Sequence, residues 1–257
     1  MMRLNYTELG QGRPIIILHG LFGSARNWQG IARSLADSHH VITPDLRNHG
    51  QSPHAQSMSY QEMTNDIIAI ADQLNLKDLI VMGHSMGGKV AMTAALTQPE
   101  RFSSLIVVDI APVNYEHDFD LLIMAMKSLN LNELKSRAQA EAVMSQTIDD
   151  TGVIQLLLQN LIRNGDKFQW RINLASIMEN LSLIGEFPDT LRGKSCRIPT
   201  LFLGGSESVY LRNIYNADIF QYFPSAEITM IKGAGHWLHA EKPGEFLKEI
   251  KTFINFV

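Results

Sequence analysis

The sequence has a single cysteine, Cys196, among 257 residues. One thiol cannot close a disulfide within the chain, so the sequence does not describe a disulfide-stabilised secreted scaffold. No thiolate-activating motif surrounds Cys196, and we expect it to be structural. A lone cysteine is typical of a reducing compartment, and the predicted location is cytoplasmic.

Long apolar runs are also missing. No stretch reaches the roughly 18 consecutive apolar residues of a transmembrane helix, and residues 1–8 lack the apolar run of a secretory signal. There is no block of Lys or Arg, and the formal net charge is −4. Nucleic acid is therefore not expected as a partner, nor is a membrane span. No pair of histidines has metal-ligand spacing with a carboxylate, so no metal site is predicted.

The chain contains short apolar runs that alternate with helical patterns. This alternation is typical of an α/β fold with a mostly parallel central sheet and helices on both faces. Residues 2–9 could add an antiparallel edge strand. The expected strands are Ile15–Leu18, Val41–Thr43, Leu79–Met82, Leu105–Val108, Thr200–Leu203 and Ile228–Ile231, and the expected helices are Asn27–Ser38, Tyr60–Leu74, Gly87–Thr97, Val209–Tyr222 and Pro243–Phe256.

The alternation stops between residues 114 and 190, which predicts a helical lid inserted into a core domain of residues 1–113 and 191–257. Apolar residues recur at helical spacing from Val153 to Ile162, and we expect no strand in the insertion. A lid over the carboxyl ends of the strands would lie where open α/β sheets bind ligands. Its Leu and Met side chains either line an acyl pocket or simply pack against the core.

The segment Leu79–Gly88 carries most of the functional information. Four apolar residues precede Gly83, and Gly83-His84-Ser85-Met86-Gly87 has the Gly-x-Ser-x-Gly pattern before a helix-forming run. In this pattern a serine stands at a sharp strand-to-helix turn, where its hydroxyl can attack a carbonyl carbon. We therefore predict Ser85 to be a nucleophile.

A serine nucleophile needs a base and two oxyanion donors. His236 follows a late strand on a Gly-rich loop, the place where the base falls in hydrolases of this type. His239 is the nearest rival, and we expect it to be a partly exposed residue on the next turn. The amides of Leu21 and Met86 are the expected donors to the oxyanion. Residues 45–52 are interpreted as a structural loop rather than a catalytic one.

Together these motifs resemble the α/β-hydrolase superfamily over essentially the whole chain. The resemblance rests on His19–Gly23, Pro44–Ser52, Gly83–Gly88 and Gly233–His236, and Val107–Val113 narrows it to bacterial esterases of the YbfF type and related abhydrolase-domain proteins. It implies an α/β-hydrolase fold and hydrolysis of carboxylic esters, or of acyl-CoA thioesters, by a serine–histidine–acid triad without a cofactor.

The acid is where this sequence departs from the common pattern. Most members of the superfamily have Asp shortly after the penultimate strand, where this chain has Gly204-Gly205-Ser206-Glu207-Ser208. The closer family uses a position that matches Asp109, which we favour. Glu207 is the alternative acid, and Ser208 is a candidate supporting contact to the acid or the histidine.

The sequence thus predicts a serine hydrolase that acts through an acyl-enzyme on a small-molecule ester or thioester. Two alternatives stay open: a C–C bond hydrolase or lyase on the same scaffold, and a non-catalytic ligand sensor. The sequence does not indicate the oligomeric state. Further candidate substrate or supporting contacts are Phe22, His84, Trp170 and Trp237.

Overall fold

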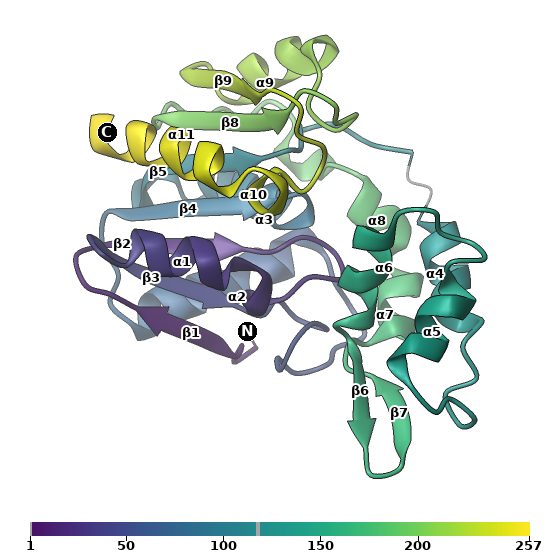
Figure 1. Cartoon of the computed structure of the whole chain (residues 1–257). Helices are drawn as coiled ribbons and strands as arrows, with labels where there is room; N and C mark the ends of the chain where they lie inside the picture. Colours follow the sequence, from purple (N-terminus) through teal and green to yellow (C-terminus); the bar gives the residue numbers. More distant parts are fainter. Residues whose placement is uncertain (1, 117–118) are drawn as a thin grey trace.

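The computed structural model describes residues 2–116 and 119–257 and has one seven-stranded sheet at its centre (Figure 1). The strand order is β1-β3-β2-β4-β5-β8-β9. β1 (Tyr6–Leu9) pairs antiparallel with β3, and the other neighbouring strands of this sheet pair in parallel. The predicted mostly parallel sheet is confirmed. Its other strands are β2 (Arg13–Leu18), β3 (His39–Pro44), β4 (Leu79–His84), β5 (Phe102–Val108), β8 (Thr200–Gly205) and β9 (Ala226–Ile231).

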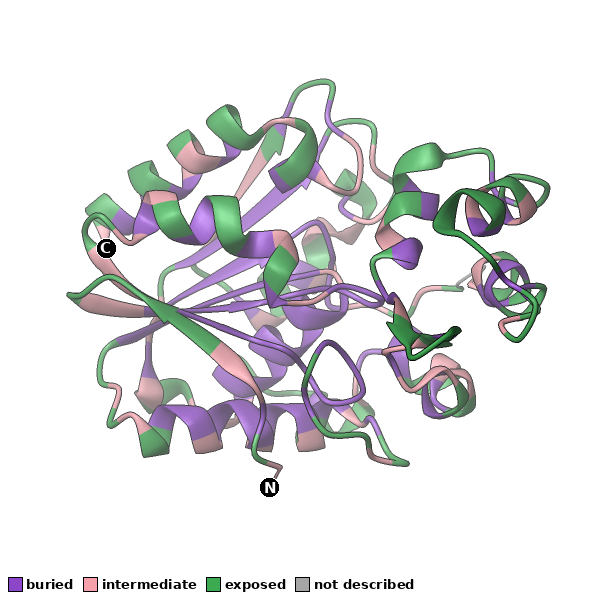
Figure 2. Ribbon diagram, turned by 60° about the horizontal axis from the view of Figure 1, so that its bottom comes forward, coloured by how far each residue is buried: buried purple, intermediate pink, exposed green. Residues whose placement is uncertain are grey.

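Both faces of the sheet are covered by helices, and Figure 2 shows the buried strands between them. On β2, Ile15 and Ile17 belong to one core cluster, whereas Ile16 and Leu18 belong to the other. Side chains alternate between faces along a strand, so a strand that is buried on both faces must be apolar at consecutive positions. One cluster includes residues of α1 (Gln29–Leu35) and α11 (Pro243–Phe256), and the other includes residues of α2 (Tyr60–Gln73), α3 (Met86–Thr97) and α9 (Asn216–Tyr222).

Helix boundaries follow local signals in two cases and depart from the prediction in another. α2 begins after a capping box of Ser59 and Glu62, and α11 begins at Pro243. The predicted helix over Val209–Tyr222 is wrong in its first half. There the Tyr210 amide donates to the Ser208 hydroxyl oxygen at 3.2 Å, which stabilises a turn, and regular helix begins only at α9.

Residues 114–190 are here called the inserted segment, and its described residues, 114–116 and 119–190, lie beyond the carboxyl ends of the parallel strands (Figure 1). The chain enters it after β5 and leaves it before β8. Its helices are α4 (Asp120–Lys127), α5 (Arg137–Met144), α6 (Thr151–Leu158), α7 (Leu174–Glu179) and α8 (Leu181–Gly185).

The expectation of an all-helical insertion is wrong. β6 (Leu161–Asn164) and β7 (Lys167–Trp170) form an antiparallel hairpin. The helical spacing of the leucines obscured a second signal, the two-residue turn Gly165-Asp166, in which Gly165 has a φ of 60°. The helix α6 ends at Leu158, and Leu161 instead pairs with Trp170 across the hairpin.

The two ends of the inserted segment are fastened to each other and to α3. The Phe187 amide donates to Asn114 Oδ1 at 2.7 Å, and the Tyr115 amide donates to the Gly185 oxygen at 3.0 Å. Lys89 of α3 is buried, and its Nζ donates to the oxygens of Gly185 and Glu186 at 2.6 and 2.9 Å. Burial lowers the pKa of Lys89 to about 7. These bonds fix the base of the insertion against the helix that follows Ser85.

Candidate active site

Ser85 stands at the turn between β4 and α3, with a φ of 53° and a ψ of −118°. A side-chain-bearing residue adopts this conformation only when the surrounding structure imposes it. The flanking glycines permit it, because a Cβ on Gly83 would lie 2.1 Å from the Gly87 oxygen and one on Gly87 would lie 2.5 Å from the His19 oxygen. The turn holds the half-buried Ser85 against a large pocket.

His236 and Asp109 meet, although 127 residues separate them in the chain. Nδ1 of His236 lies 2.7 Å from Oδ2 of Asp109, which follows β5 and is fully buried. The same Oδ2 accepts the hydroxyl of Ser208, and Oδ1 accepts the Gly205 amide at 3.1 Å. These contacts fix the orientation of the carboxylate, which in turn orients the imidazole.

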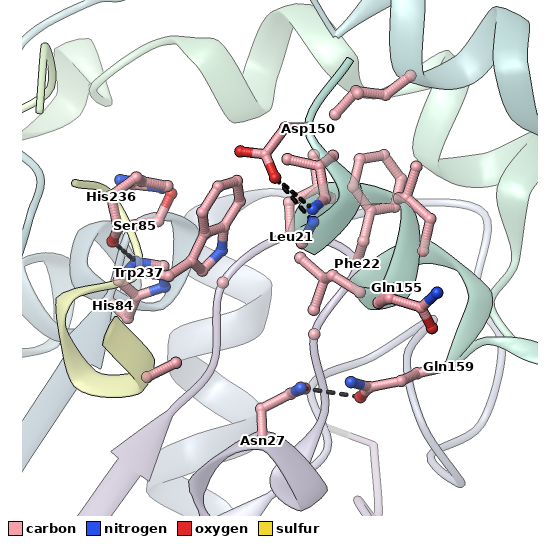
Figure 3. Close-up of a pocket in the computed structure, with 18 of the residues that line it drawn as sticks. Leu21, Phe22, Asn27, His84, Ser85, Asp150, Gln155, Gln159, His236 and Trp237 are labelled. Carbon is pink, nitrogen blue, oxygen red and sulfur yellow. Dashed lines mark hydrogen bonds between the residues drawn. The ribbon is translucent and has the colours of Figure 1, made fainter. Parts of the chain in front are cut away.

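His236 lies beside Ser85 at one end of the pocket (Figure 3). Because Nδ1 faces Asp109, Nε2 is the ring nitrogen available to the Ser85 hydroxyl. The Tyr210 ring packs on the imidazole, with centroids 4.2 Å apart. A nucleophile, a base and an orienting acid in this order constitute the arrangement that activates a serine hydroxyl.

Glu207, the alternative acid, makes no contact with His236 like that of Asp109. It is exposed, its backbone amide donates to the Ala234 oxygen at 3.0 Å, and its carboxylate lies near Gly233. Asp109, not Glu207, is therefore the carboxylate in contact with His236.

Leu21 and Met86, the predicted oxyanion donors, both lie close to Ser85, since the three residues line one small cavity. Met86 is the first residue of α3, and the first amides of a helix have no partner within the helix. Leu21 lies in a turn closed by the Gly23 amide and the Gly20 oxygen at 3.0 Å.

Two buried histidines accept hydrogen bonds from backbone amides in and around this turn. Nε2 of His19 accepts the Leu46 amide at 2.9 Å, and Nε2 of His49 accepts the Phe22 amide at 3.2 Å. Burial lowers the pKa of both rings, that of His49 to about 3. Each ring is therefore a neutral acceptor at neutral pH, and each histidine orients backbone near Leu21.

The 45–52 loop is held by its own polar groups. Asp45 accepts the amides of Ala25 and Gln51, each at 2.8 Å, and Arg47 pairs with Asp66 at 2.8 Å. Asp45 and Arg47 are buried, and neither belongs to the pocket lining formed by the described residues. These contacts fit the structural interpretation of the loop.

The pocket has a volume of about 880 Å³ and lies between the core and the inserted segment. Phe22, His84 and Trp237 line it, as Figure 3 shows. Trp170 does not belong to the lining formed by the described residues, because β7 places it opposite Leu161 in the hairpin. The inserted segment contributes mainly apolar side chains, among them Leu121, Leu122, Ile148, Val153, Leu156 and Leu157.

The ring of His84 packs against those of His236 and His239, with centroids 4.6 and 4.9 Å away. Nε2 of His84 donates to the His236 oxygen at 2.9 Å, which steadies the loop that carries the base. The expectation that His239 is partly exposed is wrong. It is 7% exposed and stacks on Trp28 with centroids 4.2 Å apart, and burial lowers its pKa to about 3. His239 lies on α10 (Leu238–Glu241), where the rings of Phe246 and of Trp28, which is distant in the sequence, pack against it.

Glu241 is a further part of this site that the sequence did not single out. Its carboxylate accepts the amide of Gly235 at 2.6 Å and that of Trp237 at 3.1 Å, the two residues that flank His236. The only signal in the sequence is an acidic residue just after the predicted base. Tyr210, which packs on the His236 ring, carries no such signal.

Within residues 2–116 and 119–257, no group of three or more His, Cys, Asp or Glu side chains is arranged to hold a metal ion. In the same part of the chain, no helix combines the length and the apolar character needed to cross a membrane.

Comparison with known proteins shows which family and which individual proteins this chain resembles. Residues 13–243 match the family model described as alpha/beta hydrolase fold. The chain is 41% identical to a protein of Danio rerio named sn-1-specific diacylglycerol lipase ABHD11, over 95% of this chain and 79% of that protein. It is 35% identical to Esterase YbfF of Escherichia coli K12, over 94% of this chain and 93% of that protein. Among solved structures, a marine microorganism esterase superposes with a TM-score of 0.94 at 38% identity, over 98% of this chain and all of that one.

Proposed function

This chain belongs to the α/β-hydrolase fold family, and we propose that it is a serine carboxylesterase. Ser85 is the nucleophile, His236 the general base and Asp109 the acid that orients the base. The observation that carries the proposal is the contact between Asp109 and His236 at the end of the pocket that Ser85 lines. The relatives named as esterases and lipases support the same reaction class.

In the proposed reaction the Ser85 oxygen attacks the ester carbonyl while Nε2 of His236 takes the hydroxyl proton. The amides of Leu21 and Met86 donate to the oxyanion of the tetrahedral intermediate. The intermediate collapses, and the alcohol leaves with the proton from His236. Water, deprotonated by His236, then attacks the acyl-enzyme and releases the carboxylic acid and Ser85.

The pocket supports acyl esters of uncharged alcohols as the main substrates. Its apolar wall comes from α4 and α6, and we propose that residues 114–190 act as a lid on a core of residues 1–113 and 191–257. Among the described lining residues there is no Lys or Arg, while Asp149, Asp150 and Glu241 are present. The phosphates of an acyl-CoA thioester would therefore have to stay outside the pocket. Thioester hydrolysis is the second activity in the proposal, and a cytoplasmic location, supported by the single cysteine, is part of it.

A substrate panel tests the proposal. Aryl esters and acyl-CoA thioesters of graded chain length are assayed with the wild-type protein, with Ser85→Ala as the blank. We expect ester hydrolysis that Ser85→Ala abolishes and covalent labelling of Ser85 by a fluorophosphonate. Labelling without ester turnover would point to a C–C bond hydrolase or lyase. Folded protein that is neither labelled nor active would contradict the proposal and favour a ligand sensor.

A further inference from the structure

A buried asparagine of the inserted segment reaches the turn that carries Leu21. Asn160 lies between α6 and β6 and is 3% exposed. Its Nδ2 donates to the Phe22 oxygen at 2.7 Å, and this bond is buried and spans 138 residues of the chain. A hydrogen bond between buried groups is costly to break, because the acceptor left behind has no water to replace the donor.

The Phe22 backbone needs this support. Its φ is 62°, a left-handed conformation that is uncommon for a bulky residue. Its amide is held by His49 on one side, and its oxygen is held by Asn160 on the other. Since Leu21 immediately precedes Phe22, these two bonds set the direction of the backbone on which the Leu21 amide lies.

Asn160 is itself fixed within the inserted segment. The backbone amide of Asn160 donates to the Leu157 backbone oxygen at 3.0 Å. The backbone oxygen of Asn160 accepts the Arg171 backbone amide at 2.8 Å. It thus ties the end of α6 to the end of the hairpin. Leu157 lines the pocket, so the structure links the pocket wall, Asn160 and the Phe22 oxygen in one continuous path.

We propose that Asn160 is a positioning residue for the oxyanion hole, holding the Phe22 peptide so that the Leu21 amide points at the oxygen of the reacting carbonyl. This inference rests on the proposed esterase function. It gives the inserted segment a role beyond forming a wall of the pocket, since the oxyanion hole is then complete only while the segment is docked on the core.

Two substitutions of Asn160 test the role. Asn160→Asp keeps the shape but presents an oxygen to the Phe22 oxygen, and Asn160→Ala removes the donor. We expect kcat to fall by roughly 10²-fold, the size of losing one oxyanion donor, while KM changes little. A trifluoromethyl ketone, whose adduct with Ser85 places an oxyanion in the hole, should lose affinity by a similar factor.

Asn180 supplies the matched control. It is another buried asparagine of the inserted segment, and its Nδ2 donates to the Gln56 oxygen at 2.9 Å, away from the Leu21 turn. Asn180→Asp and Asn180→Ala should lower the melting temperature as much as the Asn160 changes do but leave kcat near the wild-type value. Equal losses of kcat at both positions would show that docking stability alone is responsible and would overturn the inference.

The outcomes separate this inference from the proposed function. If wild-type protein hydrolyses no ester, the proposed function fails and the inference fails with it. If wild-type protein is active, Ser85→Ala is inactive and a folded Asn160 variant keeps its kcat and its ketone affinity, only the inference fails. Asn160→Asp, being isosteric, decides the matter if Asn160→Ala does not fold.

Discussion

Asp109 and His236 are joined by a contact of 2.7 Å between Oδ2 and Nδ1, and the chain supplies this carboxylate from the end of β5 rather than from the loop after β8. The end of β8 and the loop after it still take part, because the Ser208 hydroxyl of the loop donates to the same oxygen and the amide of Gly205, the last residue of β8, donates to the other. The loop that carries Glu207 thus supports the acid but does not provide it.

Asp109→Asn should lower kcat/KM by about 10⁴-fold, because the acid selects the histidine tautomer and stabilises its cation. Glu207→Gln is the control and should stay close to the wild-type value, since Glu207 is exposed and lies away from His236. Initial rates of hydrolysis of one aryl ester give kcat/KM for both variants. A large loss for Glu207→Gln with near-normal Asp109→Asn would reverse the assignment.

Glu241→Gln should lower kcat roughly tenfold. The carboxylate accepts two amides on either side of His236, and a neutral carboxamide replaces one acceptor with a donor that clashes with an N–H. Glu245→Gln, a substitution at an exposed position of α11, is the matched control and should leave kcat unchanged. Steady-state kinetics and thermal unfolding of both variants provide the test, and an unchanged kcat in Glu241→Gln would refute the role.

Gly83→Ala should prevent folding or destabilise the protein by more than about 3 kcal/mol, because the new Cβ would meet the Gly87 oxygen at 2.1 Å and backbone cannot move aside cheaply. Gly30→Ala is the control, since nothing lies within 4 Å of a Cβ there and Gly30 is on the exposed side of α1. It should stabilise the helix by up to about 1 kcal/mol. Soluble yield and urea unfolding distinguish the two, and a stable Gly83→Ala protein would contradict the strained turn.

The protein should lose stability in mild acid. Burial lowers the pKa values of His19, His49, His84 and His239, those of His49 and His239 to about 3. These histidines titrate near 6.5 in the unfolded chain, so below about pH 6.5 the unfolded state binds protons that the folded state excludes, and for His49 and His239 this window extends down to about pH 3. The free energy of unfolding therefore falls as the pH falls through this window, by up to about 1.4 kcal/mol per pH unit for each histidine.

Urea unfolding between pH 7.5 and 4 measures this slope. His239→Phe should keep the stacking on Trp28 while removing one titrating ring, so its stability should depend less steeply on pH by about one proton. A free energy of unfolding that does not change between pH 7 and 4 would show that these rings are not held neutral by the fold.

Prediction from sequence succeeded where short-range backbone constraints decide the structure. The β4 strand, the Ser85 turn and the start of α3 are contiguous, and Gly83 and Gly87 touch backbone only a few residues away or in the neighbouring strand. Prediction failed in the inserted segment, where leucines at helical spacing extended α6 into what is β6. Helix and strand periods overlap over such short distances, and the Gly165-Asp166 turn was the better guide.

Residues adjacent in the chain are enough to specify most of the alternating strands and helices, the turn that carries Ser85 and the loop that carries His236. The three-dimensional fold was needed to establish that Asp109 rather than Glu207 contacts His236, that Trp170 is not part of the pocket lining formed by the described residues and that Asn160 reaches Phe22. These relationships join residues far apart in the chain. They depend on the order of strands in the sheet and on how the inserted segment docks, which no local pattern of side chains encodes.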